Sequence, residues 1–273
     1  MPFADSDGTA IYYDDRGKGE PVLLCLPGWC VHHTIYVPLA ERLSADHRVL
    51  LTDWRGHGKS QASDHDFGYA EMVADVLSVV EASGAQSVIP IAQAHGGWVG
   101  IELFRRLRDR VPKLIFLSWN PILTSRNPQA PPSLREIQEL QSKSMWHALQ
   151  DDARSRDAVE QLVTTWVKGS PSVETQIRDE TASHGFEDWA RGGREIAAMF
   201  AREIDPLHAL SKSSPPVPAL HIYAQPPMPE WLAAQETFSR GHPWFHVRRL
   251  EAVSHFPTLE VPDETADVIR EFI

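Results

Sequence analysis

The chain has 273 residues, of which 42% are hydrophobic, so it can bury the core of one domain, and its formal net charge is −11. This acidic balance argues against a nucleic-acid partner, because binding to phosphates depends on clustered basic side chains. The N-terminus lacks the basic start and apolar run of a secretion signal, and no stretch approaches the roughly 20 apolar residues that span a bilayer. We therefore expect a cytoplasmic protein without a membrane partner.

Short apolar runs alternate with helical patterns along the chain, as a mostly parallel sheet with flanking crossover helices requires. Between Tyr69 and Ala85, apolar residues recur at spacings of three and four, which predicts a helix with one face toward the sheet, closed by Gly84. The predicted strands cover residues 10–13, 21–26, 48–53, 87–91, 113–117, 219–223 and 246–250. This rhythm predicts an α/β fold.

The stretch 121–214 breaks the rhythm, since it contains no convincing strand, is rich in charge and carries tryptophans within helical patterns. A proline-rich segment that begins at Pro215 ends it, because prolines in succession cannot continue a helix. We expect residues 1–120 to form the first part of the core, 121–214 an inserted helical cap, and 215–273 the second part of the core.

Cysteine and histidine spacing indicates no metal site. Cys25 and Cys30 are the only cysteines, too few for a disulfide framework or a zinc knuckle, and we interpret both as reduced packing residues. His32 and His33 are adjacent, so their side chains point in different directions and offer no spaced ligand pair.

Two turns follow predicted strands. In residues 26–30, Gly28 lets the backbone turn so that the next amides point into a cleft, which is how an oxyanion hole begins. Residues 53–60, which begin with Asp53, form a second turn that we interpret as a structural brace without a reactive group.

The segment 91–97 lies where a strand becomes a helix and has the form of the nucleophile elbow of the α/β-hydrolase fold. Ala94 occupies the position of the nucleophile. The amides of Trp29 and His95 are still expected to form an anion-binding pair. A plain glycine-rich turn between strand and helix is the alternative interpretation of this segment.

A candidate base lies near the C-terminus. His255 follows the last predicted strand, where this fold places its catalytic histidine in the chain order nucleophile, acid, histidine. The chain has 13 histidines, and this position distinguishes His255 from the others as the candidate general base.

Several sequence blocks, distributed over most of the chain, carry a family resemblance: 26–30, 53–58, 95–99, 221–223 with 225–226, 241–245 and 255–260. In these blocks the chain resembles the cofactor-independent 2,4-dioxygenases that cleave 3-hydroxy-4(1H)-quinolones. The last two blocks are much more specific than the elbow, which many unrelated hydrolases share.

The resemblance implies a mechanism without metal or flavin. A histidine removes the proton of the 3-hydroxyl, and the resulting anion reacts directly with dioxygen, releasing carbon monoxide and an N-acylanthranilate. His255 matches the base, and the amides of Trp29 and His95 match the hole for the 4-oxo group. Trp166 resembles a cap tryptophan that lies against the substrate, although a place in the cap core explains it equally well. The implied partners are a small aromatic N-heterocycle and O2.

Two positions depart from the family pattern. The family usually keeps a serine at the elbow, where this chain has Ala94, and an aspartate that orients the histidine, where it has Ser118. A carboxylate beside a histidine raises its pKa, so without one His255 is expected to be a weaker base. A neutral hydrogen bond from Ser118 or Asn120 could still select its tautomer.

Other function classes stay open. An O2-independent lyase or isomerase would use the same base, and a non-catalytic ligand-binding protein would explain the loss of both serine and aspartate. An esterase would need a nucleophile other than Ala94, since alanine cannot attack. The 2-substituent of the substrate and the oligomeric state are not encoded in any pattern that we identify.

Overall fold

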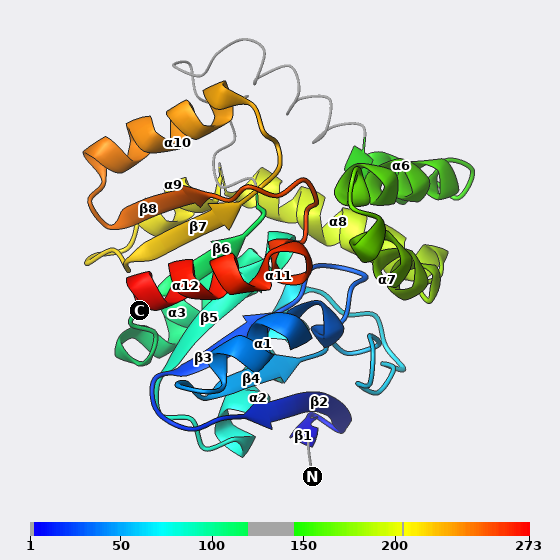
Figure 1. The fold of residues 1–273 in the computed structure, drawn as a ribbon. Helices are drawn as coiled ribbons and strands as arrows, with labels where there is room; N and C mark the ends of the chain where they lie inside the picture. Colours follow the sequence, from blue (N-terminus) through cyan, green and yellow to red (C-terminus); the bar gives the residue numbers. More distant parts are fainter. Residues whose placement is uncertain (1–2, 120–144, 204) are drawn as a thin grey trace.

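The computed structural model describes residues 3–119, 145–203 and 205–273. Within these residues the centre of the fold is an eight-stranded sheet with the order β1-β2-β4-β3-β5-β6-β7-β8 (Figure 1). The strands are β1 (Phe3–Ser6), β2 (Thr9–Arg16), β3 (Val22–Leu26), β4 (Val49–Thr52), β5 (Val88–Gln93), β6 (Leu114–Leu117), β7 (Ala219–Tyr223) and β8 (Phe245–Arg249).

The pairing from β4 through β8 is parallel, and only β1 and β2 join the sheet in antiparallel fashion. All seven predicted strands are present, one of them (219–223) with the predicted bounds and six with shifted ends, which confirms the α/β-hydrolase fold as a mostly parallel sheet. Strand β1, a four-residue edge strand, was not predicted. Its hairpin turn, Asp7–Gly8, has positive φ at both residues and is a strong local hairpin signal.

Helices cover both faces of the sheet. Leu39 of α1 and Ile269 of α12 pack on one face, whereas Val76 of α2 and Leu103 of α3 pack on the other. The predicted helix 69–85 is present as α2. The helices are α1 (Val37–Leu43), α2 (Tyr69–Ala82), α3 (Gly97–Leu107), α5 (Trp146–Leu149), α6 (Ser155–Val167), α7 (Pro171–Ala182), α8 (Phe186–Arg202), α9 (Pro206–Ser211), α10 (Pro229–Gly241), α11 (Pro257–Glu260) and α12 (Pro262–Phe272), with short 3-10 helices at His33–Tyr36, Ala94–Gly96 and Arg108–Arg110.

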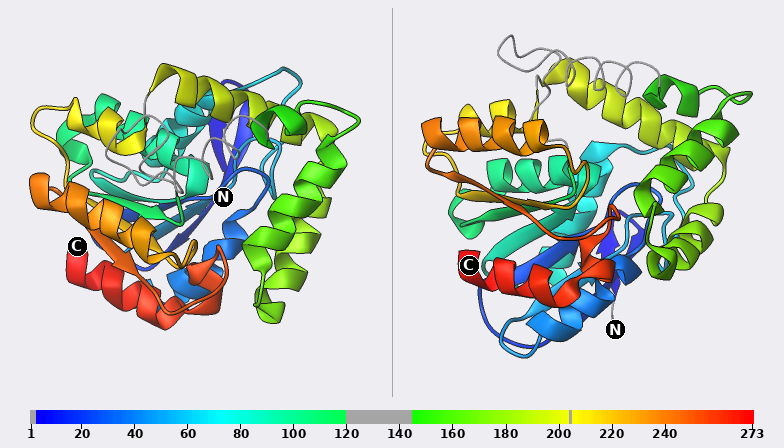
Figure 2. Two further views of the ribbon diagram at one scale, coloured as in Figure 1. Left: turned by 90° about the horizontal axis from the view of Figure 1, so that it is seen from above. Right: turned by 45° about the horizontal axis from the view of Figure 1, so that its top comes forward.

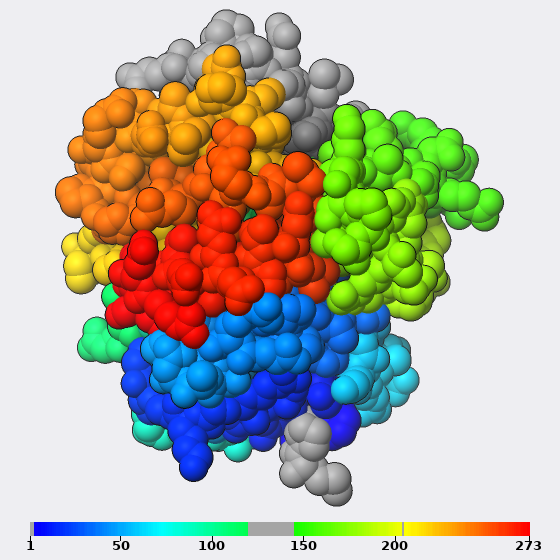
Figure 3. All heavy atoms as spheres, viewed as in Figure 1, coloured from blue at the N-terminus to red at the C-terminus, as the bar shows by residue number. Residues whose placement is uncertain are grey.

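Helices α5 to α8 follow β6 in the chain, and α6, α7 and α8 lie together at one end of the sheet (Figure 2). Atoms of this group lie directly against the C-terminal part of the chain (Figure 3). Helix α9 instead packs on α3, where Arg105 donates to the carbonyl of Ala209. The division into 1–120, 121–214 and 215–273 stays a prediction, and part of the proposed cap, 121–144, lies outside the described residues.

None of the described helices combines the length and the apolar character needed to cross a bilayer.

Candidate active site

A pocket lies beyond the carboxyl ends of β3 and β5, under the helices that follow β6. Its lining is almost entirely apolar, and it holds about 430 Å³ of space between atoms, including its open mouth. Five residues singled out from separate stretches of the sequence line it together: Trp29, Ala94, His95, Trp166 and His255. A concave, apolar pocket with few polar groups is the usual form of a small-molecule site.

The elbow forms the floor of this pocket. Ala94 directly follows β5 and has a φ of 46°, a left-handed conformation that is costly for a residue with a side chain. A Cβ atom at Gly96 would lie 2.4 Å from the carbonyl oxygen of Pro27, and one at Gly97 would lie 2.2 Å from the Trp119 ring. Only glycine fits at these two positions, and the left-handed Ala94 at the junction of strand and helix has the backbone form of a nucleophile elbow. The amide of His95 lies at the start of a helical segment, where amides have no intrahelical partner.

The loop that carries the second amide runs from Pro27 into the 3-10 helix at His33. The indole of Trp54 donates to the carbonyls of Pro27 and Gly28, at 3.2 and 3.1 Å. The amide of Cys30 donates to Nε2 of His57 at 3.2 Å, while the amide of Trp29 donates to no protein group among the described residues. The Trp29 amide is therefore available to a ligand.

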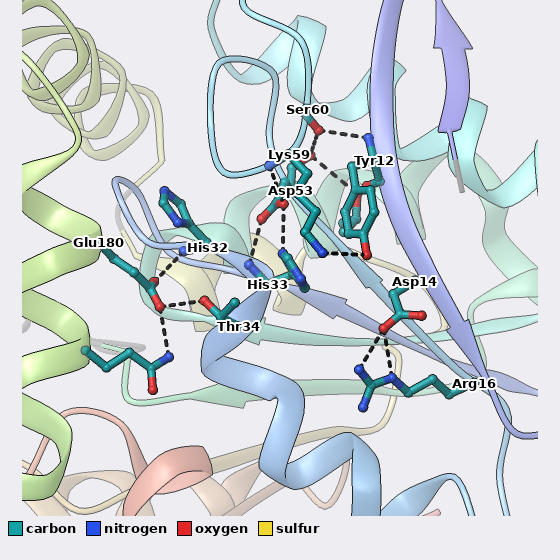
Figure 4. Close-up of polar contacts among 12 residues, drawn as sticks. Tyr12, Asp14, Arg16, His32, His33, Thr34, Asp53, Lys59, Ser60 and Glu180 are labelled. Atoms are coloured by element: carbon teal, nitrogen blue, oxygen red, sulfur yellow. Dashed lines mark hydrogen bonds and ion pairs between the residues drawn. The ribbon is translucent and has the colours of Figure 1, made fainter. Parts of the chain in front are cut away.

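Asp53 holds this loop from the core side (Figure 4). Its buried carboxylate accepts from the amide and Nδ1 of His33, at 2.7 and 2.8 Å, and from the amide of Lys59 at 3.0 Å. Burial works to raise the pKa of Asp53, but the hydrogen bonds and charge of His33 outweigh it and the net pKa is lowered. A Cβ at Gly58 would lie 2.3 Å from this carboxylate. The turn after β4 thus braces the loop, as its sequence pattern indicated.

His255 lies in the loop after β8, with its ring stacked on Trp166 at a centroid distance of 5.6 Å and an interplanar angle of 12°. Its amide donates to the carbonyl of Trp166 at 2.7 Å. Neither ring nitrogen makes a hydrogen bond to protein within residues 3–119, 145–203 and 205–273. Burial, with a smaller contribution from His221, lowers the pKa of His255 to about 4. The imidazole is therefore neutral at pH 7.

Ser118 does not line this pocket. It directly follows β6 with a φ of 47°, and its buried hydroxyl has no hydrogen-bond partner in the described part of the chain. The bond from Ser118 to His255 that the sequence allowed is therefore absent, and Asn120 lies outside the described residues. On the neighbouring strand, Nε2 of His221 accepts from the amide of Trp119 at 3.1 Å.

Gln93 is a pocket residue that the sequence analysis missed. Its side chain is 1% exposed and donates from Nε2 to the carbonyl of His255 at 2.8 Å. Its Oε1 is buried without a partner in the described residues. Gln93 therefore connects the elbow to the loop of His255 and brings an unused acceptor to the pocket lining. Its place directly before Ala94 was the signal that could have identified it.

Cys30, His57 and His184 form a cluster that could in principle bind a metal ion, because their ligand atoms lie within 4.8 Å of one another. Both ring nitrogens of His57 are already used, Nε2 by the Cys30 amide and Nδ1 by the carbonyl of Arg55 at 3.0 Å. Burial, supported by the charge of Asp188, raises the pKa of the Cys30 thiol, so the thiol is protonated. This donor set fits a hydrogen-bonded packing cluster, and the absence of a metal stays a prediction.

Comparisons with known proteins agree with this geometry. The family model described as the alpha/beta hydrolase fold matches residues 21–159. A 2-heptyl-3-hydroxy-4(1H)-quinolone dioxygenase from Mycobacteroides abscessus is 33% identical over 95% of this chain and 93% of its own. A 1H-3-hydroxy-4-oxoquinoline 2,4-dioxygenase from Pseudomonas putida is 30% identical over 100% of this chain and 99% of its own.

A solved structure gives the same result. The solved structure of an AqdC variant in complex with its substrate matches with a TM-score of 0.88 and 30% identity. That structure describes recognition and ring-cleavage of the Pseudomonas quinolone signal. The match covers 99% of this chain and 97% of that one. By fold, pocket and sequence, the chain belongs to the 3-hydroxy-4-quinolone dioxygenases, a family with the α/β-hydrolase fold.

Proposed function

We propose that the protein is a dioxygenase that opens the ring of a 3-hydroxy-4(1H)-quinolone with O2 and releases carbon monoxide and an N-acylanthranilate. The observation that carries the proposal is the neutral imidazole of His255, which has no hydrogen-bond partner among the described residues, in an apolar pocket that Trp29 and His95 also line. A base and two preorganised donors are what the formation of a substrate anion requires.

In the proposed reaction, His255 takes the proton of the 3-hydroxyl, and the negative charge spreads toward the 4-oxo group. The amides of Trp29 and His95 donate hydrogen bonds to the 4-oxo oxygen and stabilise its negative charge in surroundings that exclude water. O2 adds to the electron-rich ring, and a bridged peroxide forms between the carbons on either side of C3. The O–O bond and the two ring bonds C2–C3 and C3–C4 then break. C3 leaves as carbon monoxide with the former hydroxyl oxygen, while one atom of O2 stays in the N-acyl group and the other in the carboxylate of the product. The proton taken up by His255 is then released to solvent.

Trp166 is proposed as a wall for the flat substrate. Its ring lies parallel to His255 and 6.3 Å from the ring of Trp189, at the cap side of the pocket. Large aromatic surfaces both exclude water and accommodate a planar heterocycle. The stack also limits rotation of the His255 ring, so Trp166 would orient the base as well as the substrate.

Ala94 separates this function from ester hydrolysis. A serine esterase needs a hydroxyl at the elbow, and the methyl group of Ala94 cannot form a bond to a substrate. The relatives named above are dioxygenases, which does not favour an O2-independent lyase or a pure binding protein. We propose a small aromatic N-heterocycle and O2 as the partners, no cofactor, and the cytoplasm as the location.

The direct test is to incubate the protein with 3-hydroxy-4(1H)-quinolones that carry hydrogen, methyl or heptyl at position 2, in air and under nitrogen. Carbon monoxide and an N-acylanthranilate are expected in air only. Turnover under nitrogen would identify a lyase or isomerase instead, and saturable binding without turnover in air would identify a binding protein. The preferred 2-substituent follows from the same series.

A further inference from the structure

The loop that carries the Trp29 amide is held by the cap as well as by the core. Glu180 of α7 is 8% exposed, and its carboxylate accepts from the amide of His32 at 2.9 Å and from the hydroxyl of Thr34 at 2.5 Å (Figure 4). Hydrogen bonds to a carboxylate are shorter and stronger than those between neutral groups. Asp53 holds the residue between them, His33, from the opposite side. Three consecutive residues are thus fixed from two directions.

The side chain of Trp29 is tied to the cap by a separate contact. Its indole nitrogen donates to the carbonyl of Asp188, at the beginning of α8, at 2.8 Å. Further along α8, a Cβ atom at Gly192 would lie 2.6 Å from Cδ1 of Trp29, so only glycine lets the helix pack this closely on the indole. The cap therefore contacts both Trp29 itself and the loop segment that follows it.

We propose that Glu180 is a positioning residue for the reaction: from the cap, it fixes the loop 29–34 so that the Trp29 amide meets the oxygen of the substrate anion. The inference rests on the proposed function. Glu180 does not line the pocket and acts only through the backbone that it holds.

The required precision explains why such a contact matters. An oxyanion donor acts at hydrogen-bond distance, and a misplacement of about 1 Å can cost on the order of 100-fold in rate. Without Glu180, the His32 amide and the Thr34 hydroxyl lose their acceptor, and of the two carboxylates only Asp53 still holds the loop. We expect the Trp29 amide to be displaced without being lost as a donor, because the Trp29 indole still donates to the carbonyl of Asp188.

The test compares Glu180→Ala and Glu180→Gln with the control Thr181→Val. Thr181 is the next residue of α7, is also buried, and donates to the carbonyl of Ile177 at 2.7 Å without reaching the loop. Two experiments are made with each variant. Steady-state kinetics give kcat and KM for quinolone cleavage. A titration under nitrogen, followed by the absorbance of the bound quinolone, gives the pH at which the quinolone ionises.

Glu180→Ala is expected to lower kcat by about tenfold with KM little changed, and to raise the pKa of the bound ligand by about one unit. Glu180→Gln keeps one acceptor oxygen and is expected to fall between Glu180→Ala and the wild type. Unchanged kcat and ligand pKa in Glu180→Ala, or equal changes in Thr181→Val, would overturn the inference. The ionisation measurement needs no turnover, so a wild type that binds and ionises the quinolone without cleaving it would contradict the proposed function alone.

Discussion

The two sides of the pocket are built in different ways. On the donor side, the loop 29–34 is held by the carboxylates of Asp53 and Glu180, and the indole of Trp54 holds the carbonyls of Pro27 and Gly28 just before it. On the base side, the loop of His255 is held through its backbone and by a stack on Trp166, and the imidazole has no polar partner among the described residues. The loop of the Trp29 amide is thus fixed by hydrogen bonds to two carboxylates, whereas the imidazole of His255 has no such bond in the part of the chain that the structure describes.

This difference follows from what each group must do. A backbone amide stabilises an anion only from a fixed position, so its loop needs strong anchors. A general base must be neutral and have a free lone pair, which burial provides by lowering the pKa of His255 to about 4. Ser118 stands where the resemblance places an aspartate, and among the described residues no carboxylate raises this pKa.

The largest expected effect comes from removal of the base. His255→Ala is predicted to lower kcat by about 10²- to 10⁴-fold, the usual contribution of a general base, while a quinolone still binds to the two amides. Oxygen uptake and carbon monoxide release measure the rate, and anaerobic titration measures the binding. His65→Ala, which removes an exposed histidine, serves as the control. A His255→Ala variant with more than about a tenth of the wild-type rate would show that the base lies elsewhere.

The next prediction concerns pH. Because the pKa of His255 is lowered to about 4, protonation of the base reduces kcat/KM only as the pH falls toward 4, and the rate is not limited by it between pH 7 and pH 5. Ser118→Asp places a carboxylate at the position of the family aspartate and is predicted to raise the pKa by about 1–3 units, which moves the acid limb to higher pH.

Profiles of kcat/KM against pH test both predictions. Ser118→Ala is the control, because the Ser118 hydroxyl has no hydrogen-bond partner to lose among the described residues. A wild-type acid limb near the ordinary histidine pKa of about 6.5 would contradict the picture of an apolar, unpaired base.

A smaller effect is expected at Gln93. Gln93→Met keeps the length of the side chain but removes the donor to the His255 carbonyl, so the loop of the base becomes less ordered. We predict that kcat falls by about tenfold and that the acid limb moves upward as water reaches the imidazole. The control is Thr181→Val, which loses a buried hydrogen bond from its side chain to the carbonyl of Ile177. It is expected to leave the acid limb of the pH profile unchanged. Equal pH profiles in Gln93→Met and Thr181→Val would show that Gln93 has only a structural role.

The smallest effect is expected at the elbow. Ala94→Ser introduces a hydroxyl at the nucleophile position, but His255 has a low pKa and no carboxylate of the described residues orients its ring. We predict no acyl-enzyme with an activated ester, as measured by mass spectrometry, and little change in quinolone cleavage. A stable acyl adduct would mean that the two sides of the pocket can cooperate as a hydrolase, against the proposed division of roles.

Much of the fold and part of the site could be read from the sequence because they depend on local pattern and chain order. Buried strands have apolar runs, the elbow has small residues around Ala94, and His255 follows the last strand. These features are contained in a few adjacent residues each. Even the missed strand β1 had a local signal in Asp7–Gly8.

The sheet, the elbow and the position of the candidate base could therefore be predicted from the chain alone. The side chains that hold them became evident only in three dimensions: Gln93 meets the His255 carbonyl across 162 positions, and Glu180 meets His32 across 148. The fold also leaves the Ser118 hydroxyl without a partner among the described residues. The physical reason is that a hydrogen bond depends on distances of a few ångströms between chain-distant atoms, and no local spacing encodes that distance.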